Sequence, residues 1–121
     1  MRASDEQSPP ASRPTGAPPE ILRSPLPPWR GVEIWPLLHG VLEFAVAIRQ
    51  RLLTDPPDAV AVELPETLQQ PVMRAVDRLP YLSMVTSESS AGEVYVPVEP
   101  TDGAMEALRF SLEQDLPAYL V

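Results

Sequence analysis

The sequence of 121 residues contains no cysteine, so disulfide bonds, thiolate metal sites and cysteine nucleophiles are excluded. Lysine and asparagine are also absent, and all nine basic residues are arginine, a bias that we attribute to a GC-rich genome. No apolar run reaches the length of a membrane span, and the start "MRASDEQSPP" lacks the apolar core of a secretory signal. We therefore expect a cytoplasmic protein that does not insert into a membrane.

Positive charge is scarce after residue 30. Residues 1–30 carry four arginines against three acidic residues, whereas residues 31–121 carry five arginines against 14 acidic residues, a net charge of −9. A body this acidic repels a phosphate backbone and anionic lipid. We therefore expect no nucleic-acid partner and no docking on membranes.

Proline divides the chain into two parts. Eight of the 17 prolines fall in residues 1–30, which hold few large apolar residues. Such a segment cannot bury enough apolar surface to offset the entropy lost on ordering. The composition predicts a disordered Pro-rich segment over 1–30 and an α/β domain over 31–121.

Hydrophobic periodicity in residues 31–121 predicts alternating strands and helices. The expected strands are 32–38, 58–64, 81–87, 93–98 and 118–121, and the expected helices are 40–53, 65–79 and 101–115. This order favours a mostly parallel open sheet with crossover helices, in which 58–64 is buried on both faces and 93–98 folds back on 81–87. A parallel strand at the end of the chain needs a covering helix. We therefore expect an incomplete domain, the N-terminal part of a larger protein.

The last expected helix has a clear start and a clear pattern of faces. Thr101 or Asp102 is expected to cap its N-terminus. The residues expected on its core face are Met105, Leu108 and Leu112. The residues expected to form an exposed ladder of alternating charge are Glu106, Arg109 and Glu113.

The candidate catalytic residues are His39, the only histidine, with Glu43 and Glu63. His39 follows the first expected strand and Glu63 ends the second, so both are expected at the carboxyl edge of the sheet, where ligands bind. Glu43 lies four residues after His39, where a carboxylate can orient the imidazole as a general base for water. Gly40 permits an unusual backbone or a close approach by substrate. The alternative is structural: His39 packs on Trp35 or Leu38, and capping alone explains Asp102.

The same residues carry a resemblance to a known group of proteins. "HGVLEF" (39–44) and "PDAVAVELPE" (57–66) resemble the opening of the erythromycin esterase, TraB and ChaN-like superfamily, and are most similar to an uncharacterised bacterial family of larger proteins. The resemblance implies an α/β hydrolase-like protein in which His39 activates water while Glu43 and Glu63 support it or help to hold a divalent metal. Leu37 and Leu38 replace the glycine and acid that usually precede the histidine in the esterases.

Two other functional interpretations are compatible with the sequence. The first is a non-catalytic protein-interaction module, in which "SPLPPW" (24–29) docks in an aromatic groove or an uncovered sheet binds a protein partner. The second is a truncated piece without activity of its own, whose missing C-terminal region would complete the site. The substrate, a small molecule if the chain is an enzyme, is not indicated by the sequence.

Overall fold

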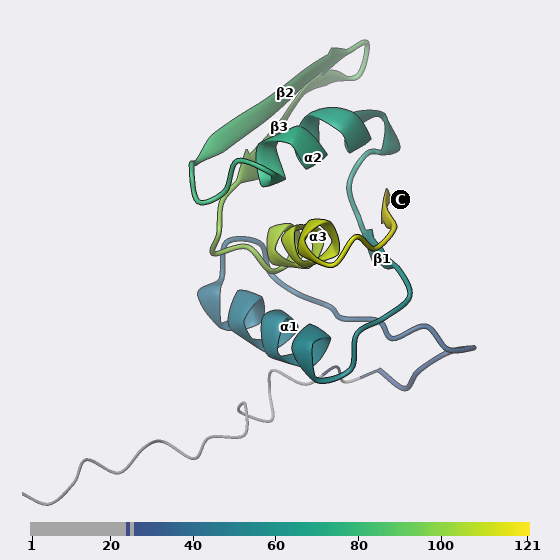
Figure 1. Ribbon diagram of the computed structural model, residues 1–121. Coiled ribbons are helices and arrows are strands. Elements are labelled where there is room, and N and C mark those ends of the chain that lie inside the picture. The colour runs from purple at the N-terminus through teal and green to yellow at the C-terminus, as the bar shows by residue number, and fades with distance from the viewer. Residues whose placement is uncertain (1–23, 25) are drawn as a thin grey trace, which may run out of the picture.

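The computed structural model describes residue 24 and residues 26–121, which form a mixed α/β fold (Figure 1). The predicted disordered segment 1–30 lies outside the described residues, apart from Ser24 and residues 26–30. The helices are α1 (Leu42–Thr54), α2 (Gln69–Val76), which follows the 3-10 turn η2 (Glu66–Leu68), and α3 (Gly103–Glu113). The strands are β1 (Val60–Val62), β2 (Ser83–Ser89), β3 (Gly92–Val98) and β4 (Ala118–Leu120).

The described strands form two separate pairs, and only the shorter pair is parallel. β1 runs parallel to β4, with Val60 opposite Ala118 and Val62 opposite Leu120. β2 and β3 form an antiparallel hairpin, as expected from the turn between them. Such a short connection joins antiparallel strands, because a parallel pair needs a long crossover. The expected mostly parallel sheet is thus reduced to the β1–β4 pair.

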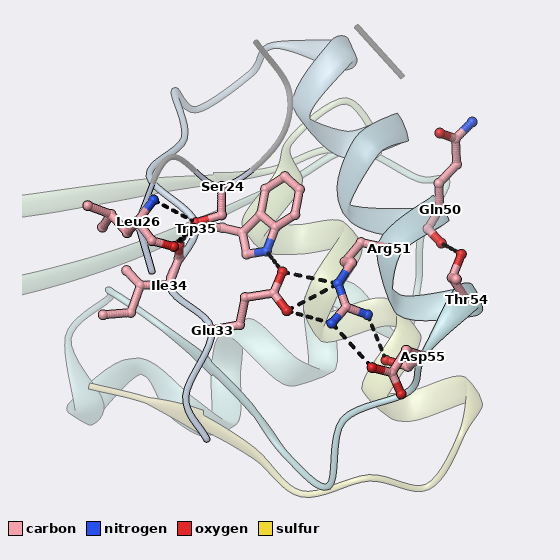
Figure 2. Close-up of polar contacts among 9 residues, drawn as sticks. All are labelled: Ser24, Leu26, Glu33, Ile34, Trp35, Gln50, Arg51, Thr54 and Asp55. Carbon is pink, nitrogen blue, oxygen red and sulfur yellow. Dashed lines mark hydrogen bonds and ion pairs between the residues drawn. The ribbon is translucent and has the colours of Figure 1, made fainter. Parts of the chain in front are cut away.

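The prediction of a strand over 32–38 was wrong. Side-chain contacts hold this segment to the fold, and it lacks the regular backbone hydrogen bonds to a neighbouring strand that a strand requires. Its one strand-like contact is a bridge between Trp29 and Val32, and Pro36 removes a backbone donor. Glu33 accepts hydrogen bonds from Trp35 Nε1 at 2.6 Å and from Arg51 Nη2 of α1 at 2.5 Å (Figure 2). The segment therefore lies against α1 as an extended strap.

Helix α3 occupies the middle of the molecule, between α1 on one side and α2 with the β2–β3 hairpin on the other (Figure 1). The main apolar cluster joins α3 to α2 and to both strand pairs, and contains no residue of α1. Its largest members are Val60, Val62, Leu68, Val72, Val76, Val85, Val96, Val98, Met105, Leu108 and Leu120. A central α3 explains why the ends of this helix meet distant parts of the chain.

Three predictions of burial were wrong. Ala61 of β1 is exposed, so β1 is buried on one face only. Leu112 is 42% exposed, whereas Glu106 is only 7% exposed. The reason is the same for both residues of α3: α1 covers the helix face that carries Glu106, and periodicity alone cannot tell which neighbour covers which face.

Candidate functional site

The candidate site is built on the N-terminus of α3, where Asp102 is the N-cap. Its Oδ1 accepts a hydrogen bond from the Met105 amide at 3.0 Å, as predicted for a cap. Its Oδ2 accepts two more, from His39 Nδ1 at 2.8 Å and from the Gly40 amide at 2.9 Å. The carboxylate is almost fully buried, with its side chain 4% exposed. Three N–H donors therefore meet one buried carboxylate, which offsets the cost of burying its charge.

The turn before α1 brings His39 to this carboxylate. Gly40 has a φ of +70°, in the left-handed region that only glycine adopts without strain. A Cβ at this position would also lie 3.0 Å from Glu99 Oε1. The sequence prediction of an unusual backbone at Gly40 is thus confirmed, and its consequence is a backbone amide that shares Asp102 with the imidazole.

The imidazole of His39 is oriented by Asp102 and open to solvent. A carboxylate only accepts hydrogen bonds, so in the neutral ring Nδ1 carries the proton and Nε2 has the lone pair. The His39 side chain is 63% exposed, and no partner for Nε2 is found among the described residues. An imidazole with one nitrogen bonded to a carboxylate and the other free is able to take a proton from water.

The two glutamates of the predicted site are solvated surface residues. Glu43 is exposed in the first turn of α1, and Glu63 is exposed directly after β1. Across residues 24 and 26–121, neither glutamate forms a hydrogen bond or ion pair with His39. Solvation accounts for Glu63, because an exposed carboxylate carries no burial cost.

A metal centre is not supported by the described residues. No group of three histidine, cysteine, aspartate or glutamate side chains in that part of the chain is arranged to hold a metal ion. The His39–Asp102 pair is a positioned imidazole with a single carboxylate beside it. Such a pair can support proton transfer, and no step through a metal follows from it.

Sequence reasoning assigned Asp102 to capping alone and so missed its contact with His39. The two residues are 63 positions apart, and no local pattern links them. One signal in the sequence pointed toward this contact: Asp102 and His39 both stand just before a helix. The N–H groups of a helix start are free to bind, and they attract carboxylates. That signal indicates where a carboxylate sits but does not identify its second partner.

A second buried acid, Glu106, lies between α1 and α3. Its Oε1 is 3.3 Å from Arg49 Nη1, and its Oε2 is 3.7 Å from Arg109 Nη1. Burial raises the pKa of Glu106 above its ordinary value, and Glu113 adds to this, while Arg109 and Arg49 oppose it. Arg49 also lies over the Phe110 ring, 5.6 Å from its centre. This cluster joins the two helices, and both carboxylate oxygens of Glu106 already face an arginine.

No family model, no curated protein and no solved structure matches the chain. The resemblance to the erythromycin esterase, TraB and ChaN-like superfamily therefore stays a prediction from short motifs. None of the helices in the described residues is both long enough and apolar enough to span a bilayer.

Proposed function

We propose that this chain carries a hydrolase-like, water-activating site in which His39 is the general base and Asp102 positions it. The observation that supports this proposal is the 2.8 Å hydrogen bond between His39 Nδ1 and Asp102 Oδ2 beside an imidazole that is 63% exposed. The buried carboxylate fixes the ring and its tautomer, and Nε2 faces water. Glu43 and Glu63 are not needed to orient the imidazole in this proposal.

The proposed step is attack of water on the carbonyl carbon of an ester. Nε2 takes a proton from water while the water oxygen bonds to the carbonyl carbon, and the imidazolium that forms is stabilised by the Asp102 carboxylate. Collapse of the tetrahedral intermediate breaks the bond to the alkoxide, which takes the proton back from Nε2. The products are a carboxylic acid and an alcohol.

We propose that residues 31–121 are the N-terminal part of a larger α/β domain, as the resemblance implies, and that this domain belongs to a cytoplasmic protein. The support is the incomplete cover of the β1–β4 pair, where Ala61 is exposed and Tyr119, opposite it, is 54% exposed. Apolar side chains in this position are normally covered by a further layer of structure.

The test of the catalytic proposal uses hydrolysis of ethyl dichloroacetate, whose alkoxide is too poor a leaving group for direct displacement by an imidazole nitrogen, so that imidazole acts on this ester as a general base for water. Because His39 is the only histidine, free imidazole at the same concentration is a direct reference for an unpositioned ring. We expect the chain to hydrolyse the ester about 100-fold faster than imidazole, the lower end of what positioned general bases achieve. We expect His39→Gln to lose this excess.

Two results would decide against the catalytic role. One is a rate no higher than that of free imidazole. The other is a His39→Gln variant that keeps the full rate, because the activity would then come from another group or from a contaminant. Glu43→Gln is the matched control, since it changes a neighbouring exposed residue that makes no contact with the imidazole, and it should keep the rate.

A further inference from the structure

An open groove of ≈ 550 Å³ lies between α2 and β2. Neither His39 nor Asp102 lines it, so it is separate from the candidate active site. One wall, the helix wall, is made by α2 with Arg74 and by the turn after α2 with Asp77 and Arg78, and β2 contributes residues 83–86. The groove therefore has one charged wall and one wall made by a strand.

The strand wall of the groove is the free edge of β2. Side chains of consecutive strand residues point to opposite faces, so a groove that touches 83, 84, 85 and 86 in turn runs along the strand edge. β2 pairs with β3 on one side, and no described strand pairs with its other side. A free edge presents backbone N–H and C=O groups that can pair with another chain.

The helix wall carries two positive charges without acidic partners. Arg74 lies in the last turn of α2 and Arg78 in the turn that follows the helix, and both are exposed. Arg78 Nη2 donates to Ser83 Oγ at 3.2 Å, which places its guanidinium over the start of β2. Among the described residues neither arginine forms an ion pair with a carboxylate, whereas the arginines of α1 and α3 all do.

We propose that this groove binds an extended peptide that pairs with the free edge of β2 and places carboxylate side chains against Arg74 and Arg78. Strand addition supplies the backbone hydrogen bonds, and the two guanidiniums select acidic side chains. The net charge of −8 does not prevent this, because charges beyond about 8 Å are largely screened at physiological salt. Asp77, the one acid in the wall, limits the affinity.

The test is a titration of the full chain with a fluorescent peptide in which valine alternates with glutamate, at physiological salt. We expect saturable binding, and about tenfold weaker binding for a peptide with glutamine in place of glutamate. Arg74→Gln and Arg78→Gln should each weaken binding of the glutamate peptide by a similar factor. Asp77→Asn should strengthen binding, a gain that an unfolded variant cannot produce.

Two controls separate this mode of binding from simple charge attraction. Arg30→Gln removes the same charge outside the groove and should leave the affinity unchanged. A glutamate peptide with alternate backbone nitrogens methylated cannot complete the ladder and should bind at least tenfold more weakly. Equal binding of the methylated peptide, an equal loss in Arg30→Gln, or no saturable binding of the unmodified peptide would each overturn the proposal.

Discussion

Asp102 carries out two tasks, because its two carboxylate oxygens face different donors. Oδ1 caps α3 through the Met105 amide, and Oδ2 holds the Gly40 amide and the His39 ring. A cap needs only one acceptor oxygen. The second oxygen is therefore free to position the imidazole, and its burial excludes the water that would compete for Nδ1.

Asp102→Asn tests this division of labour. The amide has a single acceptor oxygen, so at least one of the three N–H donors loses its partner. We expect the free energy of unfolding to fall by about 1–3 kcal/mol, the cost of an unsatisfied buried donor. We also expect the neutral ring to shift from the Nδ1–H tautomer toward the Nε2–H tautomer, measured by ¹⁵N NMR on the single histidine.

Asp58→Asn is the matched control for this substitution, because Asp58 is exposed and makes the same charge change. It should alter neither the stability nor the tautomer. An Asp102→Asn variant that keeps the Nδ1–H tautomer would show that the carboxylate does not position His39, even if the stability falls, because loss of the cap alone lowers stability.

At the scale of elements, the contact between α1 and α3 contains the buried acid Glu106. Two arginines pair with it, but burial still raises its pKa. The folded chain therefore favours protonated Glu106 more than the unfolded chain does. The stability that this provides is present below the unfolded pKa and is lost as the pH rises through the higher folded pKa.

Glu106→Gln removes this pH dependence while keeping the shape of the side chain. We expect the stability of the variant relative to the natural chain to increase as the pH rises above the ordinary pKa of a glutamate, since only the natural chain must ionise a buried group. Urea unfolding at a series of pH values measures the difference. Glu88→Gln, at an exposed position of β2, is the control and should show no such trend. If the relative stability of Glu106→Gln instead falls as the pH rises, the ion pairs with the two arginines outweigh the cost of burial.

At the scale of the whole molecule, the β1–β4 pair joins two distant parts of the chain with very few contacts. Each strand has three residues, and one face of the pair carries the exposed Ala61 and Tyr119. Val60, Val62 and Leu120 attach the pair to the core through its other face. Short, half-covered strands open more readily than a central helix does.

Hydrogen exchange on the isolated chain tests whether this region is part of an incomplete domain. We expect the β1 and β4 amides to exchange at least tenfold faster than the amides of α3, because opening the pair exposes little core. The hairpin amides of β2 and β3 provide an internal reference for well-paired strands. Protection of β1 equal to that of α3 would indicate an autonomous fold and would contradict the proposal of a missing layer.

The sequence by itself determined the local features of this protein. Helical spacing placed α1 and α3, the turn between two alternating runs placed the β2–β3 hairpin, and the cap residue at Asp102 was correct. Pro71 also lies in the first turn of α2, as its missing N–H requires. These features depend on residues that are close in sequence, so local stereochemistry decides them.

The tertiary structure alone decided which distant residues meet. The meeting of His39 with Asp102, the burial of Glu106 against Arg49 and the attachment of Glu33 to Arg51 all join separate segments. Periodicity shows that a helix has a buried face but not which side chain from elsewhere in the chain covers it. The carboxylate partner of His39 was fixed by the packing of α3 in the centre of the fold, and only the three-dimensional arrangement could identify it.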